Sequence, residues 1–281
     1  MIDPFSSRMG RRNFLLTVSA IISWTLAKQA SRRALASPQF SNYPFALGVA
    51  SGDPTSDSVV LWTRLISSSV AETTPISDDL IVSWQIAADP QMRNVVSRGT
   101  TIASPELAHS VHVVVDGLSS DREYWYQFQA GKELSPIGRT RTLPEPTASA
   151  ESLKFAFVSC QNYEQGYFNP YRHLADEDLD FVIHLGDYIY EYAANTSGPF
   201  PRQHPAVECS DLATYRQRYS LYKRDRDLQA AHAAFPFICT WDDHEVENDY
   251  ANAESENFEA KQTFLQRRTA AYQAYYEHLP L

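Results

Sequence analysis

The chain has 281 residues, of which 43% are hydrophobic and 12% aromatic, enough for a folded core and for two domains. Its formal net charge is −10, and the basic clusters that bind nucleic acid are missing, so a nucleic-acid-binding surface is excluded. Three cysteines are too few for a disulfide framework, although a Cys209–Cys239 pair in an oxidising compartment stays open.

Residues 1–36 have the pattern of an export signal. Arg11 and Arg12 precede an apolar stretch that is too short to span a membrane, and residues 34–36 (Ala-Leu-Ala) form a small-x-small cleavage site. The paired arginines predict the twin-arginine export machinery and a periplasmic or secreted location. A basic amphipathic anchor is the alternative. Removing residues 1–36 takes away six basic residues and one acidic residue, which leaves a formal charge of −15.

Residues 44–143 have the pattern of an all-β domain. Four short segments rich in β-branched and aromatic residues, separated by turns, predict strands at 58–65, 80–86, 110–115 and 123–128. Regular short strands of this kind predict an N-terminal β-sandwich of the fibronectin-III or Ig-like type. Tyr124 and the residues before it resemble a tyrosine corner, in which the phenol hydroxyl bonds to the chain just upstream.

A second domain is predicted for residues 151–281, after a linker rich in Pro and small residues at 143–150. Here strands alternate with helices, which indicates an α/β layer structure. The predicted strands are 153–159, 180–185 and 235–239. The predicted helices begin at Asn169-Pro170 (with Asn as the cap), near Ser210-Asp211, and at Asn257, the last running to His278.

Each of the three predicted strands of this domain ends in side chains that can bind a metal. The first is followed by Cys160, the second by Gly186-Asp187, and the third by Asp243-His244. Parallel sheets bind ligands at the carboxyl ends of their strands, so these side chains are expected to meet. Three such endings in succession predict a dinuclear metal site. An ordinary solvated acidic loop is the alternative for residues 242–245.

Gly186 allows a sharp turn that would place Asp187 as a carboxylate bridging two cations. Tyr190 lies three residues further on, close enough to reach the same metal, although a packed aromatic residue is an equal alternative. Thiolate and phenolate ligands favour a Lewis-acidic ion such as Fe(III), because both lose a proton on binding. His184 lies within the apolar run and is expected to be a core histidine.

These motifs closely resemble the alkaline phosphatase D family of metallophosphoesterases, and residues 50–64 resemble its N-terminal domain. The resemblance implies a calcineurin-like αββα catalytic domain after the sandwich. It implies that Cys160, Asp187 and Tyr190 hold an iron, with Asp187 bridging to calcium. It also implies that Asp243 binds the second metal and that His244 protonates the leaving group or steadies the phosphoryl oxygens.

The predicted function is hydrolysis of phosphate mono- or diesters by a metal-bound hydroxide at a dinuclear site. Phosphate-ester small molecules are the predicted substrates, and the sequence does not decide between monoesters and diesters. Two alternatives remain. One is an inactive cell-surface or adhesion protein with a degenerate phosphatase fold, and the other is a metallo-oxidoreductase built on an iron–tyrosinate–thiolate centre.

The predicted ligands cover about half of the donor atoms that two hard cations require. The final helix carries an aromatic stripe (Phe264, Tyr272, Tyr275, Tyr276) with no later element to cover it. We therefore expect the chain to be an N-terminal portion of a longer enzyme, with an incomplete metallophosphoesterase domain. Alone, it is expected to bind metal weakly, to expose apolar surface and to hydrolyse phosphodiesters poorly.

Overall fold

A computed structural model of the chain describes residues 40–66, 78–149 and 152–281. All of these belong to a single unit that spans residues 37–281. The predicted export signal at residues 1–36 lies outside the described residues. Among the helices that are described, none combines the length and the apolar character needed to cross a membrane.

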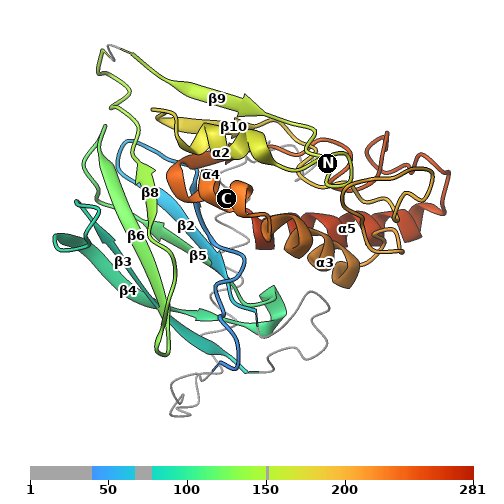
Figure 1. Cartoon of the computed structure of the whole chain (residues 1–281), viewed down its shortest axis with the longest axis horizontal. Helices are drawn as coiled ribbons and strands as arrows, with labels where there is room; N and C mark the ends of the chain where they lie inside the picture. The colour runs from blue at the N-terminus through green and yellow to red at the C-terminus, as the bar shows by residue number, and fades with distance from the viewer. Residues whose placement is uncertain (1–39, 67–77, 150–151) are drawn as a thin grey trace, which may run out of the picture. The chain divides into compact units, whose positions relative to one another are not determined.

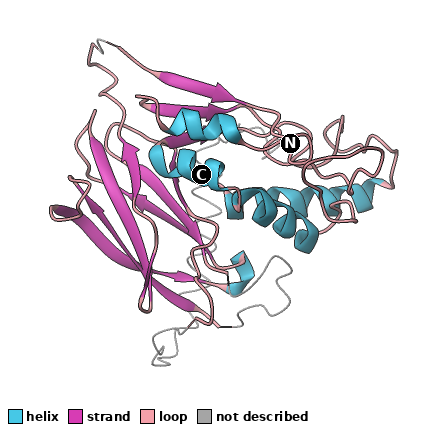
Figure 2. Cartoon of the chain, viewed as in Figure 1, coloured by secondary structure: helices cyan, strands magenta, loops and turns pink. Residues whose placement is uncertain are grey.

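A five-stranded antiparallel sheet forms one layer, built entirely from residues before the linker (Figure 2). Its strands are β3 (Leu80–Ala87), β4 (Val95–Ala103), β6 (Glu123–Ala130), β7 (Glu133–Leu134) and β8 (Gly138–Arg141). Alternate residues of β6 are buried, which is the pattern of a strand with one face on a core. The predicted strands at 80–86 and 123–128 are therefore confirmed.

A six-stranded mixed sheet forms the second layer and joins residues from both sides of the linker. Its order is β5 (Ser110–Val115), β2 (Val59–Arg64), β1 (Val49–Gly52), β11 (Pro236–Cys239), β10 (Phe181–His184) and β9 (Phe155–Val158). The connection between the two halves is the parallel pairing of β1 with β11, in which Ser51 lies opposite Pro236. The strands before residue 143 thus form two sheets, and one of these continues into the strands that carry the predicted site.

The two sheets pack face to face around one apolar core. Val59, Leu61 and Val113 of the mixed sheet meet Val82 and Tyr126 of the antiparallel sheet, and all five are buried. The bond predicted for the tyrosine corner is also present, because the backbone N–H of Ser119 donates to the Tyr124 hydroxyl at 2.8 Å. Because this core is closely packed, one face of the mixed sheet is held against the antiparallel sheet.

Four α-helices follow the strands of the second half: α2 (Asn169–Ala175), α3 (Leu212–Lys223), α4 (Arg226–Ala234) and α5 (Lys261–His278). Figure 1 shows α2 and α4 side by side next to β10, and α3 running along α5. Helix α3 begins where predicted, near Ser210-Asp211, and the Asp211 carboxylate caps it by accepting the Thr214 N–H. The predicted Asn169 cap is wrong, because Asn169 lies inside α2 and Phe168 occupies the cap position without a side-chain bond.

The aromatic stripe of α5 is covered, contrary to the expectation. Phe264 and Tyr275 are buried, and Tyr276 stacks on His112 of β5 with ring centroids 4.5 Å apart. The Trp241 ring packs against the rings of Tyr272 and Tyr275. Local sequence patterns do not reveal this cover, because the covering elements (α3, β5 and the loop after β11) precede α5 by tens to more than a hundred residues.

Candidate metal centre

The loop after β10 turns at Gly186 and passes very close to the loop after β11. Gly186 has φ +113°, and a Cβ at this position would lie 2.5 Å from the Asp242 Cβ and 2.6 Å from the Asp242 backbone nitrogen. Only glycine combines this backbone conformation with the absence of a side chain. The predicted role of Gly186 in the turn is therefore confirmed, and its effect is to bring the two loops into contact.

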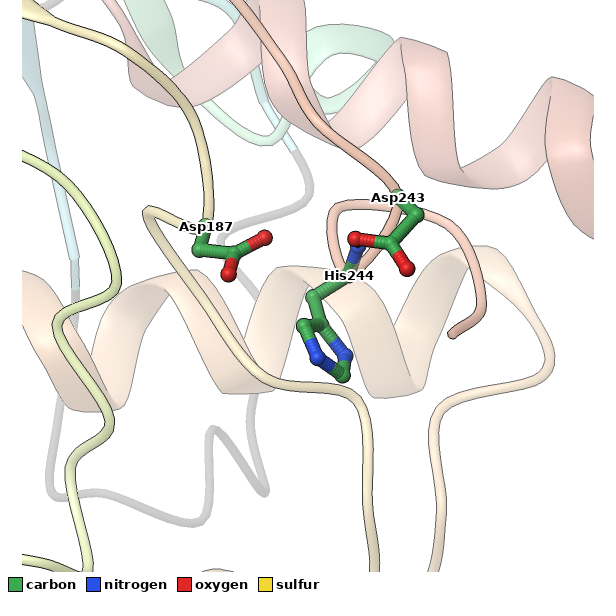
Figure 3. Close-up of side chains that lie close together, drawn as sticks. All are labelled: Asp187, Asp243 and His244. Atoms are coloured by element: carbon green, nitrogen blue, oxygen red, sulfur yellow. The ribbon is translucent and has the colours of Figure 1, made fainter. Parts of the chain in front are cut away.

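Asp187, Asp243 and His244 lie together where these loops meet (Figure 3). One carboxylate oxygen from each aspartate and one imidazole nitrogen all lie within 4.8 Å of one another. Figure 3 shows the Asp187 carboxylate directed toward Asp243, with the His244 ring beside both. Such a set of oxygen and nitrogen donors can bind a divalent or trivalent cation.

The Asp187 carboxylate has one oxygen left without a partner in the protein. Asp187 is 7% exposed, and its Oδ1 atom is buried without a hydrogen bond among the described residues. A buried carboxylate oxygen without a donor is unfavourable in a folded protein. Its backbone is also in the left-handed region, with φ +54°. An orphaned oxygen on a residue with a costly backbone conformation fits a metal ligand.

Tyr190 and Cys160 extend the cluster on one side. The Tyr190 hydroxyl donates to Asp187 Oδ2 at 3.0 Å, and the Cys160 thiol lies close enough to influence the same phenol. Burial, followed by the adjacent Asp187 carboxylate, raises the pKa of Tyr190 above its usual value, so the phenol is protonated at neutral pH. Cys160 is exposed, and its N–H donates to the Gly186 carbonyl at 3.2 Å.

The imidazole of His244 is held by a buried glutamate that the sequence reasoning missed. Glu191 is 1% exposed and its Oε2 lies 2.8 Å from His244 Nδ1, while its Oε1 accepts the Asn248 N–H at 2.8 Å. Burial lowers the pKa of His244, but the hydrogen bond and charge of Glu191 outweigh it, so the pKa is raised overall. The only sequence signal for Glu191 was its place directly after Tyr190.

Glu245 binds the backbone of both loops. It is fully buried and accepts the backbone N–H groups of Tyr188 and, at 2.7 Å, of Asp242. Burial raises the pKa of Glu245 to about 7. The segment after β11 is therefore not a solvated acidic loop, since Glu245 faces inward and Asp243 and His244 line the cluster. His184 is a core residue as predicted, although its Nε2 has no hydrogen-bond partner among the described residues.

All five predicted site residues are thus brought into one neighbourhood. Three form the compact group in Figure 3, Tyr190 joins it through its hydroxyl, and Cys160 lies in the adjacent loop, where its N–H donates to the Gly186 carbonyl. Cys209 and Cys239 are free thiols, so the disulfide left open by the sequence is absent here.

Two family models match the chain, one described as PhoD-like phosphatase, N-terminal domain, over residues 28–144, and one as PhoD-like phosphatase over residues 155–281. Alkaline phosphatase D of Bacillus subtilis (strain 168) is 53% identical over 249 residues. That similarity covers 88% of this chain and 43% of the relative. A solved structure titled "Structure of PhoD" matches with a TM-score of 0.83 and 52% identity, covering 87% of this chain and 47% of that one. The chain therefore spans less than half the length of these relatives.

Proposed function

Because the chain belongs to the PhoD-like phosphatase family, we propose that it carries part of the metal centre of an exported phosphoesterase that hydrolyses phosphate mono- or diesters. The observation that supports this proposal best is the convergence of Asp187, Asp243 and His244, with one buried Asp187 oxygen left without a donor. The charge of the protein is consistent with bound metal ions, since a chain of net charge −10 needs a local cationic centre to attract an anionic ester.

In this proposal Cys160, Asp187 and Tyr190 would hold Fe(III), and Asp243 would hold a calcium ion, with the Asp187 carboxylate available to both. The donors suit these ions, because thiolate and phenolate stabilise a strongly Lewis-acidic metal and carboxylates suit a hard divalent one. When bound, the two cations would neutralise the phosphoryl oxygens and acidify a coordinated water to the hydroxide nucleophile.

The protein's own contribution to catalysis centres on His244. Glu191 fixes the ring through Nδ1, which leaves Nε2 as the atom able to pass a proton to the departing alcohol. The raised pKa of His244 keeps the ring protonated to higher pH, as an acid catalyst requires. Loss of such a group is expected to lower turnover by about 10²–10⁴-fold.

The finer description of the fold is part of the same proposal. Two sheets packed face to face, with the bond of a tyrosine corner, support a fibronectin-III or Ig-like sandwich before residue 143. Three parallel strands with helices alongside support a calcineurin-like layer for residues 151–281. We further propose that Arg11 and Arg12 direct export of the folded chain by the twin-arginine route, with cleavage after Ala36.

The test is metal analysis of the purified chain together with assays on paired chromogenic substrates, a phosphate monoester and a phosphate diester. We expect iron and calcium in the wild-type chain, and slow hydrolysis that is lost in Asp187→Asn, because this change removes the bridging charge. Glu254→Gln, in an exposed turn, is the control for loss of an acidic residue. Equal metal content in wild type and Asp187→Asn, or hydrolysis that survives Asp187→Asn, would refute the proposal.

A further inference from the structure

The hydroxyl of Tyr222 on α3 lies between the two loops that carry Cys160 and Tyr190. Tyr222 is fully buried, and its oxygen accepts the Tyr190 N–H at 3.2 Å and the Tyr163 N–H at 3.1 Å. Tyr163 follows Cys160 by three residues. One phenol oxygen therefore binds the backbone of both loops.

The hydrogen-bond capacity of this phenol is completely used. A tyrosine hydroxyl offers one donor and accepts through its remaining lone pairs, and both N–H groups can only donate. The phenol proton is therefore left for His204, whose Nε2 lies 3.0 Å away. Burial lowers the pKa of His204 to about 3, so the ring is neutral and its Nε2 can accept. The arrangement admits no alternative direction for these three bonds.

The peptide groups on both sides of Tyr190 are held by the same helix. Its N–H donates to Tyr222, and its carbonyl accepts from the guanidinium of Arg218, one turn earlier on α3. Arg218 is 1% exposed and does not reach the metal cluster through any described contact of its own. The backbone of Tyr190 is thus held at both its N–H and its carbonyl, while its hydroxyl donates to Asp187.

The first loop is also bound to the second by a separate side chain. Gln161 Nε2 donates to the Tyr188 carbonyl at 2.7 Å, and Tyr171 donates to Gln161 Oε1 at 2.5 Å. Gln161 holds the Cys160 loop directly after Cys160, whereas Tyr222 holds the same loop two residues later, at Tyr163. The loops that carry Cys160 and Tyr190 are thus joined by two buried side chains, Gln161 and Tyr222.

We propose that Tyr222 is a positioning residue of the metal centre, whose hydroxyl sets the relative placement of the Cys160 and Tyr190 loops. The inference rests on the proposed function, since it assumes that these two side chains bind iron. It predicts that losing one hydroxyl, which touches no ligand side chain, weakens metal binding. Residues that orient metal ligands in this way typically change affinity by about 10–100-fold when altered.

The experiment compares Tyr222→Phe with Tyr219→Phe. Tyr219 lies on the same helix, is also fully buried, and its hydroxyl has no hydrogen-bond partner among the described residues. Both changes remove one buried oxygen, but only the first deprives two N–H groups of their acceptor. Ferric citrate is titrated into each variant, and bound iron is followed by its charge-transfer absorption and by elemental analysis after gel filtration.

We expect Tyr222→Phe to weaken iron affinity at least about 10-fold and to shift the absorption band, with Tyr219→Phe close to wild type. Equal affinities in the two variants would overturn the inference while leaving the proposed function intact. Wild-type protein that takes up no iron would instead refute the proposed centre, and the inference with it.

A second measurement decides the matter if Tyr222→Phe does not fold. Amide hydrogen exchange of the wild-type chain reports directly on the Tyr163 and Tyr190 N–H groups. We expect both to exchange as slowly as the buried strand β10, because both donate to a fully buried oxygen. Rapid exchange of both amides would show that Tyr222 does not hold the loops, and would overturn the inference.

Discussion

Replacing Lys223 with methionine should stabilise the protein and remove a pH dependence that the lysine imposes. Lys223 ends α3 and is 1% exposed, with its Nζ 4.3 Å from the centre of the Trp62 ring and 3.5 Å from His232 Nε2. Burial lowers the pKa of Lys223 from 10.5 to about 7. Methionine keeps a straight apolar chain of similar length and removes the amine.

The size of the effect follows from the two pKa values. Each pKa unit corresponds to about 1.4 kcal/mol, so a fall from 10.5 to about 7 corresponds to about 5 kcal/mol in all. Between these values the unfolded chain binds the proton and the folded chain does not, so the free energy of unfolding rises with pH. At pH 7 nearly all of this free-energy cost of burying the protonated lysine is present. Between pH 7 and pH 9 this residue should add about 2 kcal/mol of stability.

The measurement is urea unfolding followed by circular dichroism at pH 7, 8 and 9 and constant ionic strength. Lys223→Met should be more stable than wild type by about 4 kcal/mol at pH 7, with a difference about 2 kcal/mol smaller at pH 9. Lys261→Met is the control, because Lys261 is exposed on α5 and should leave the pH dependence unchanged. Parallel stability–pH curves for wild type and Lys223→Met would show that the buried amine is not the cause.

Three further predictions concern the metal loops and export. Gly186→Ala should destabilise the fold by at least about 2 kcal/mol in urea unfolding, because its Cβ would meet Asp242 at 2.5 Å; unchanged stability would contradict the close approach. Tyr190→Phe should weaken or shift the iron charge-transfer band with little loss of stability, and a band identical to wild type would exclude phenolate ligation. Changing Arg11 and Arg12 to Lys should leave precursor in the cytoplasm in a fractionation assay, and normal export would reject the twin-arginine route.

The parts of the fold that sequence predicts well are those set by neighbouring residues. The strands at 153–159, 180–185 and 235–239 are confirmed because each is a short apolar run with a sharp end. The predicted start of α3 near Ser210-Asp211 is confirmed, and there the Asp211 carboxylate accepts an N–H from Thr214, only three residues away. Local chemistry of this kind leaves its mark in consecutive residues.

What the sequence did not predict depends on contacts between distant segments. Helix α4 was missed because Arg226–Ala234 is polar and Ala-rich, and is stabilised by packing against α2 and β1 rather than by a strong apolar pattern. The role of Glu191 was missed because its partner, His244, lies 53 residues further on. The structure places Asp187, Asp243 and His244 together, as expected from the shared edge at the ends of parallel strands, and metal binding by them stays a prediction.

The pairing of the first strands with the last helix also sets the order of events during synthesis. The indole N–H of Trp62 in β2 donates to the Glu277 carbonyl at 3.0 Å, across 215 residues of sequence. At 5–20 residues per second, a ribosome needs roughly 10–40 s to make the intervening chain. During that time β2 lacks a partner that it has in the finished protein. The nascent N-terminal strands therefore spend tens of seconds incompletely covered, which is an interval in which chaperones can bind them.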